Sequence, residues 1–127
     1  MLVYTILVTS SVLESQNSRS AFLFVNSLLH NTSHSIHSIF FYSNGAFNGT
    51  TMIKIDEIDL SEKWYKLSKI FSINLYICST AAQDRGIIPS HIKQCTDLHE
   101  NIRHGFQLAG LGQLIYAILN TDRFLQF

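Results

Sequence analysis

The stretch Asn74–Cys78, with the sequence Asn-Leu-Tyr-Ile-Cys, is a short apolar run that leads directly into Ser79–Ala82, with the sequence Ser-Thr-Ala-Ala. A run of this length followed by small and polar residues predicts a buried strand that is followed directly by a helix. Cys78 then lies where free N–H groups of the first helical turn favour a reactive thiolate. The competing interpretation is a small, inert residue that ends a buried strand, because free cysteines are often buried.

Strand and helix patterns alternate along the whole chain. Strands are expected over residues 2–8, 36–42, 74–78 and 122–127. Ser18 is the expected cap of the first helix, whose inner face carries Ala21, Val25, Leu28 and Leu29. Asp59 to Glu62 resembles a capping box, which predicts a second helix that buries Leu60, Trp64, Leu67 and Phe71.

The second half of the chain continues this alternation. A short helix is expected over residues 79–85, closed by Gly86. A polar, partly helical segment follows over residues 89–104, and a last long helix is marked by Leu108, Leu111, Ile115 and Ile118. Alternation without hairpin turns predicts an α/β fold, namely a single-domain three-layer α/β/α sandwich over residues 1–127 with a mostly parallel sheet and flavodoxin-like topology.

In a parallel sheet, ligands and reactive groups gather at the carboxyl ends of the strands. Cys78 and the loops 9–17 and 43–51 all follow predicted strands, so we expect them to share one surface. The first loop contains no glycine, which disfavours a nucleotide-binding site. Gly110 and Gly112 lie in an apolar helical pattern and do not follow a predicted strand, so close helix packing is the expected reason for them.

The composition narrows the possible functions. The chain has 127 residues, of which 46% are hydrophobic and 14% charged, and its net charge is zero. These values predict one globular domain with large buried or subunit-facing surfaces, and no direct contact with nucleic acid because no Lys/Arg cluster is present. The apolar start is too short for a membrane span and lacks the basic flank of a signal peptide, so we expect a cytoplasmic protein without membrane contact.

The remaining cysteine and the histidines suggest no metal or cofactor. Two cysteines do not make a disulfide framework in a cytoplasmic protein, and the six histidines show no ligand spacing typical of a metal site. Cys95 falls between apolar residues and is interpreted as packing, with a resolving-thiol role as the less favoured alternative. Tyr42 is expected in the core, and lining a partner surface is the alternative.

Three blocks of sequence, together with the helix start at 20–22, resemble the DsrE/DsrF/DsrH family over essentially the whole chain. The blocks are residues 40–46 with Asn48; Cys78 with Ala81, Ala82, Arg85 and Gly86; and residues 105–112 with 122–124 and Phe127. The resemblance implies a DsrE-like fold and a sulfurtransferase that carries a persulfide on Cys78. The backbone N–H groups of Ser79, Thr80 and Ala81 are expected to stabilise the thiolate or persulfide, and Arg85 to dock an acidic partner surface or cap the helix.

The resemblance also implies partners. It suggests a dimer of heterotrimers with TusB-like and TusC-like subunits, a TusA-like sulfur donor and a TusE-like acceptor, in a relay that ends in the 2-thio group of wobble uridine in transfer RNA. Two alternatives stay open. One is a non-catalytic structural subunit of a DsrE-like complex, and the other is a flavodoxin-like module that binds a nucleotide or another small molecule.

Overall fold

The computed structural model describes residues 1–53, 59–87 and 100–127, and within them the five strands form one parallel sheet. The sheet has the order β4-β3-β2-β1-β5. The strands are β1 (Val3–Val8), β2 (Ser35–Phe41), β3 (Asn74–Cys78), β4 (Phe106–Ala109) and β5 (Arg123–Gln126). The α/β fold class is confirmed. The order differs from the flavodoxin arrangement 2-1-3-4-5, because β2 and β3 both extend the sheet in one direction from β1.

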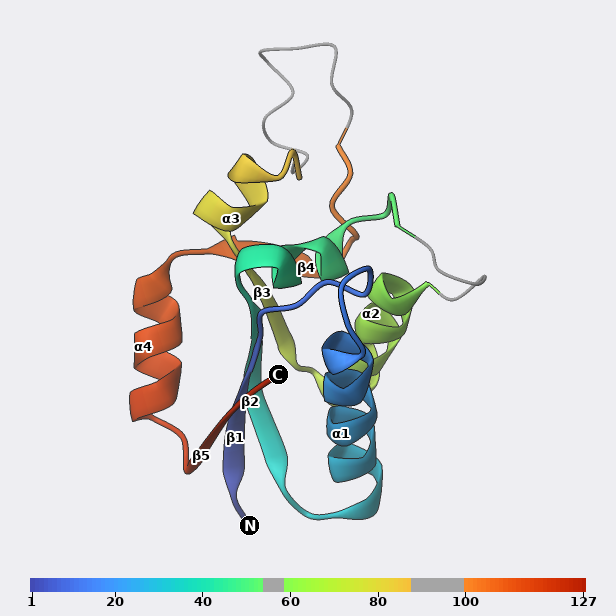
Figure 1. Ribbon diagram of the computed structural model, residues 1–127. Helices are drawn as coiled ribbons and strands as arrows, with labels where there is room; N and C mark the ends of the chain where they lie inside the picture. Colours follow the sequence, from blue (N-terminus) through green and yellow to red (C-terminus); the bar gives the residue numbers. More distant parts are fainter. Residues whose placement is uncertain (54–58, 88–99) are drawn as a thin grey trace.

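The helices form layers on both faces of the sheet (Figure 1). Helices α1 (Asn17–Asn31) and α2 (Leu60–Phe71) cover one face, and α4 (Leu111–Leu119) covers the other. A short 3-10 helix, η1 (Ser43–Gly49), and α3 (Ser79–Asp84) lie at the carboxyl ends of β2 and β3. In the described part of the chain, no helix combines the length and the apolar character needed to cross a membrane.

The core is centred on aromatic side chains between the sheet and the paired helices. Trp64 is fully buried, and its ring lies 5.4 Å from that of Phe41 and 5.1 Å from that of Phe22 in edge-on arrangements. Phe106 packs against Phe41 at 5.5 Å. Each buried aromatic side chain stabilises the fold by about 2–3 kcal/mol, so this cluster fixes α2 against β2 and β4.

Three expectations about helices were wrong. Phe106–Ala109 pairs with β3 as a strand, so Leu108 is not helical and the last helix begins at Leu111. Leu111 and Ile115, two of the apolar residues that mark this helix in the sequence, are 48% and 55% exposed, because the helix turns Leu114 and Ala117 toward the sheet instead. Gln16, not Ser18, is the N-cap of α1, and the Ser18 hydroxyl donates to the Ser10 carbonyl. In the 89–104 segment, residues 100–104 contain no helix and the rest lies outside the described residues.

Gly45 allows η1 to pack directly on the end of β1. A Cβ atom at this position would lie 2.0 Å from the Val8 carbonyl oxygen, which also accepts a hydrogen bond of 3.0 Å from the backbone N–H of Tyr42. At Gly110 and Gly112, in contrast, a Cβ atom would meet nothing within 4 Å. The expectation that close helix packing explains these two glycines is therefore wrong.

Asn48 locks η1 to three neighbouring elements. Its side chain is buried, and its Nδ2 group donates to the carbonyls of Ser10 and Gly45 and to the hydroxyl of Ser18, at 3.2, 2.9 and 3.0 Å. Its Oδ1 atom accepts a hydrogen bond from Trp64 Nε1 at 3.3 Å. The Asn48 amide thus connects four elements by hydrogen bonds, namely the β1–α1 loop, α1, η1 and α2.

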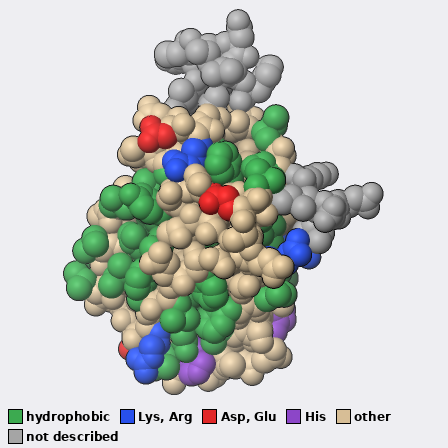
Figure 2. All heavy atoms as spheres, in the orientation of Figure 1, with side chains coloured by type: hydrophobic (Ala, Val, Ile, Leu, Met, Phe, Trp, Pro, Cys, Tyr) green, Lys and Arg blue, Asp and Glu red, His purple; other side chains and the backbone are tan. Residues whose placement is uncertain are grey.

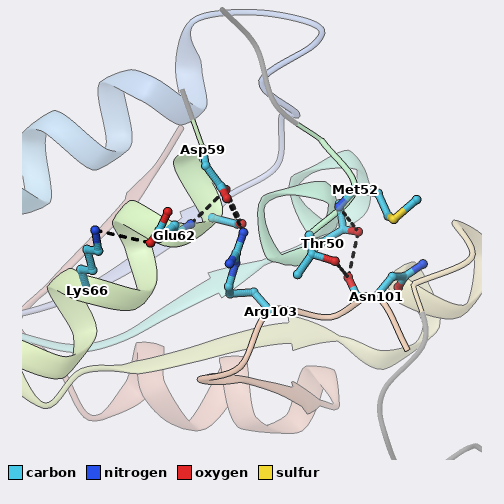
Figure 3. A network of polar contacts seen from close by, with 9 residues as sticks. Thr50, Met52, Asp59, Glu62, Lys66, Asn101 and Arg103 are labelled. Atoms are coloured by element: carbon cyan, nitrogen blue, oxygen red, sulfur yellow. Dashed lines mark hydrogen bonds and ion pairs between the residues drawn. The ribbon is translucent and has the colours of Figure 1, made fainter. Parts of the chain in front are cut away.

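A second polar network joins the start of α2 to the segment before β4 (Figure 3). The Asp59 carboxylate caps α2 through Glu62 N at 3.2 Å, accepts from Ser61 Oγ at 2.7 Å and pairs with Arg103. Arg103 Nε also donates to Ser61 Oγ at 3.0 Å. Burial on its own raises the pKa of Asp59, but the hydrogen bonds from Ser61 and Glu62 N, together with Arg103, outweigh it and hold that pKa below the ordinary value.

The two types of glycine predict opposite effects on stability. Gly45→Ala should lower the free energy of unfolding by roughly 2 kcal/mol or more, because the added methyl group collides with backbone that cannot move away. Gly112→Ala should raise it by about 0.5–1 kcal/mol, because alanine is the better helix former and the site is open. Urea unfolding followed by circular dichroism measures both, and equal effects of the two substitutions would contradict this account.

The Asp59–Arg103 pair predicts a loss of stability in acid. Because the folded-state pKa of Asp59 is lowered, its contribution is present above the unfolded value of 3.8 and is lost as the pH falls through the lower folded pKa. Asp59→Asn keeps a good N-cap but removes the charge. It should lower the free energy of unfolding by roughly 1–3 kcal/mol at pH 7, and that free energy should then fall less steeply as the pH is lowered. Glu62→Gln, in the exposed pair with Lys66, is the control and should change little.

Candidate functional site

Cys78 occupies the junction between β3 and α3. Its neighbours Leu75 and Ile77 are buried, which fixes the strand, and register pairing places Cys78 beside Ala109 of β4. Cys78 is itself the N-cap residue of α3 and is 3% exposed. The expected strand-to-helix junction is thus found, and the reactive thiolate remains a prediction.

A cavity of about 300 Å³ reaches this buried cysteine. The volume is at the lower end of the range for ligand pockets and exceeds what one additional sulfur atom needs. Its apolar and polar walls come from β3, η1, α3 and α4 and from residues next to them, contributed by Tyr42, Ser43, Cys78, Thr80, Ala81, Asp84, Arg85 and Leu111. The site therefore has room for side chains of a second molecule next to the thiol.

The thiol does not make the helix-capping contact that the sequence suggested. The side chain of Cys78 accepts no capping hydrogen bond from α3, which is only six residues long. Thr80 and Ala81 line the cavity with Cys78, whereas Ser79 is exposed and does not line it. Stabilisation of a thiolate by these three N–H groups remains a prediction.

Arg85 is the C-cap residue of α3, and it lines the same cavity as Cys78. Its Nε group donates to Asn44 Oδ1 at 2.8 Å, its Nη1 group to the Ala81 carbonyl at 3.1 Å, and its Nη2 group to Ser43 Oγ at a longer 3.4 Å. These contacts tie α3 to η1. All three acceptors are neutral, and the guanidinium forms no ion pair within the described parts of the chain.

The cavity wall includes a residue with unfavourable backbone geometry. Ser43 has φ 56°, in the left-handed region that residues other than glycine rarely adopt. Such conformations persist where the surrounding structure enforces them. Here the chain leaves β2 and turns sharply into η1, which places Ser43 and Asn44 against Arg85.

Tyr42, next to this turn, is 39% exposed and lines the cavity, so the partner-surface alternative describes its position better than the core.

The loops after β1 and β2 share this edge of the sheet, as expected. The Asn48 contacts join the 9–17 loop to η1, and Arg85 joins η1 to α3. Sequence reasoning placed Asn44 near the cysteine only as part of the 43–51 loop, and it did not expect Leu111 there. For Asn44 the signal was present in the turn-forming Ser-Asn-Gly sequence after a strand. Leu111 was expected only as one of the residues that mark the last helix, and nothing in the sequence shows that it lines the cavity.

The described residues offer no competing metal site. No group of three or more His, Cys, Asp or Glu side chains within residues 1–53, 59–87 and 100–127 is arranged to hold a metal ion. His34 instead accepts a hydrogen bond of 2.9 Å from the N–H of Leu2. Cys95, His91 and His99, considered in the sequence, lie outside the described residues.

Proteins similar to this chain include curated sulfurtransferases from bacteria. "Sulfurtransferase TusD" of Buchnera aphidicola subsp. Acyrthosiphon pisum is 42% identical in an alignment of 127 positions that covers 98% of each chain. "Sulfurtransferase TusD homolog" of Vibrio vulnificus is 40% identical and covers 98% of this chain and 96% of its own, and the homolog of Haemophilus influenzae is 35% identical over 94% and 95%.

The fold also matches a solved structure. The crystal structure of the ychN protein from E. coli superposes with a TM-score of 0.70 over the full length of both chains, at 17% sequence identity, which speaks for the fold alone. The family model described as DsrE/DsrF-like matches residues 2–127. With this match over the sheet, the cysteine junction and α4, the chain belongs to the DsrE/DsrF-like family.

Proposed function

We propose that this chain is a cytoplasmic sulfurtransferase that carries sulfur as a persulfide on Cys78. The observation that carries the proposal is the buried Cys78 thiol at a strand end, reached by a cavity of about 300 Å³, in a chain 35–42% identical to curated TusD sulfurtransferases. The chemistry needs an accessible thiol and no other reactive group.

The transfer proceeds in two exchanges. The Cys78 thiolate attacks the terminal sulfur of a donor persulfide, the sulfur–sulfur bond of the donor breaks, and the donor thiolate leaves. The acceptor thiolate then attacks the outer sulfur of the Cys78 persulfide and releases the Cys78 thiolate. A sulfur–sulfur bond is about 2.05 Å long, so the added atom extends from the buried position toward the cavity. No electrons are gained or lost overall.

The relay is proposed to run from a TusA-like donor to a TusE-like acceptor and to end in 2-thiouridine at the wobble position of transfer RNA. The resemblance of the sequence to its family supports these partners. The zero net charge supports a protein that meets other proteins and leaves the nucleic acid to a later enzyme. The alternative, a structural subunit without transfer activity, draws support from the 3% exposure of Cys78.

Assembly with TusB-like and TusC-like subunits is proposed from the outer face of α4. Exposed apolar side chains gather along this helix and on β5, namely Leu111, Ile115, Tyr116, Leu119 and Phe124, with exposures from 38% to 77%. Hydrophobic side chains are grouped on this side of the molecule (Figure 2). A helix with no charged residue from Leu111 to Leu119 is typical of one that is covered on both sides.

Cys78→Ser should abolish sulfur transfer and leave the fold intact. The hydroxyl has nearly the volume of the thiol but cannot hold sulfane sulfur. The variant, assembled with its partners, should accept no radioactive sulfane sulfur from a cysteine desulfurase and TusA-like donor. It should also fail to restore 2-thiouridine, measured by mass spectrometry, in a strain that lacks the native gene. Cys95→Ser is the matched control and should transfer normally. Normal thiolation by a correctly assembled Cys78→Ser complex would leave the structural-subunit alternative.

The α4 face predicts which substitutions weaken assembly. Ile115→Gln and Leu119→Gln should each lower affinity for co-expressed partner subunits by about tenfold or more, because a large apolar side chain contributes roughly 1.5–3 kcal/mol when buried at an interface. Ile70→Gln, at a residue 68% exposed on α2, is the control. Light scattering after size-exclusion chromatography measures the species formed. Unchanged assembly of both α4 variants would contradict the proposed interface.

A further inference from the structure

Among the described residues that line the Cys78 cavity, Arg85 is the cation, and part of its hydrogen-bonding capacity is unused. An arginine side chain has five N–H groups. Three of them are engaged by Asn44, Ala81 and Ser43. Two N–H groups therefore remain for a molecule that enters the cavity, and the charge is not cancelled by its present acceptors.

Asn44 fixes where that charge lies. Its Oδ1 atom holds Arg85 Nε at 2.8 Å, and Asn44 belongs to η1, which Asn48 and the contact at Gly45 lock onto β1. A guanidinium held in this way is preorganised for a planar anion, because little side-chain freedom remains to be lost on binding.

Asp84, the charged side chain next to Arg85 in the described lining of the cavity, does not pair with it. Asp84 lines the same cavity but is exposed, and within the described structure it forms no ion pair with its neighbour. Tyr42 and Leu111 supply partly exposed apolar surface. A visiting segment therefore meets a buried sulfur, apolar side chains and one oriented guanidinium.

We propose that Arg85 is a specificity-determining anion site, which binds a carboxylate carried close to the sulfur of the donor or acceptor, and that Asn44 positions it. The inference rests on the proposed function, because it assumes that Cys78 exchanges sulfur with a second protein. The site selects partners in which an acidic group accompanies the reactive cysteine, and it disfavours thiols with a basic neighbour.

The test measures how fast Cys78 reacts with thiosulfonates that differ only in charge. Its thiolate attacks the sulfenyl sulfur of each reagent, forms a mixed disulfide and releases methanesulfinate. The probes are 2-sulfonatoethyl, methyl and 2-(trimethylammonium)ethyl methanethiosulfonate, and modification of Cys78 is followed by mass spectrometry. Each rate is divided by the rate with the neutral probe. In the wild type, the anionic-to-neutral rate ratio should exceed the cationic-to-neutral rate ratio.

Variants separate charge from folding. Arg85→Gln should lower the anionic-to-neutral rate ratio by about three- to tenfold, and Arg85→Lys should retain most of it. Asn44→Asp keeps an acceptor for Arg85 but neutralises its charge, so it should lower the ratio as far as Arg85→Gln. Asp84→Asn should raise it. Arg123→Gln removes an exposed arginine on β5 and should leave it unchanged.

The source of the carboxylate is resolved with three short cysteine peptides activated as pyridyl disulfides. One carries Glu beside cysteine and an amidated end, one carries Gln and a free terminal carboxylate, and the reference carries Gln and an amidated end. The peptide that gains rate over the reference in an Arg85-dependent manner identifies the source.

A rate ratio unchanged in both Arg85→Gln and Asn44→Asp, or lowered equally by Arg123→Gln, would overturn the inference. This failure is distinct from failure of the relay. The neutral probe reports the thiol itself, and radioactive sulfur on Cys78 reports transfer without reference to Arg85.

Discussion

The side-chain amide of Asn48 is the contact on which the arrangement of the site depends. It is buried, and it satisfies polar groups from the β1–α1 loop, α1, η1 and α2 at once. An unpaired buried amide is costly, so these four elements have one low-energy arrangement. The close contact of Gly45 with β1 adds a steric limit to the same position. Together they make η1 a fixed wall beside the cysteine, and the orientation of Arg85 follows from that wall.

The candidate site combines a buried thiol with a positive charge held in a fixed position. In the proposed transfer, burial of Cys78 restricts exchange to molecules that can enter the cavity, while the guanidinium of Arg85 lines that cavity with neutral hydrogen-bond partners. Specificity arises when a binding site both fits one partner and penalises others. Shape and charge thus act on different features of an incoming segment, and the outer face of α4 stays available for association with other subunits.

Much of this could be predicted from local sequence. The strand Asn74–Cys78, the α3 helix after it and the Asp59 cap of α2 depend on neighbouring residues, and they are found as expected. The strand Phe106–Ala109 could not be predicted, because it is defined by pairing with β3 about thirty residues earlier. The surroundings of Cys78 depend on contacts such as Arg85 with Asn44, which are distant in sequence and leave no periodic pattern. The outward face of α4 was missed because apolar side chains such as Leu111 and Ile115 also lie on its exposed side, so helical spacing of apolar residues does not single out the buried face.

The position of β5 beside β1 has a consequence for how the chain folds. These strands lie about 119 residues apart in sequence, and they are joined by the ladder from Tyr4 to Leu7 and by hydrogen bonds of 2.8 Å at each end of it, from Asp122 N to the Val3 carbonyl and from Phe127 N to the Leu7 carbonyl. Long-range pairing of this kind slows folding, because the loop must close before its contacts contribute. During synthesis, the edge of β1 that pairs with β5 therefore stays unpaired until β5 has been made. Until then, among the described strands, only β2 pairs with β1, and α1 covers its face.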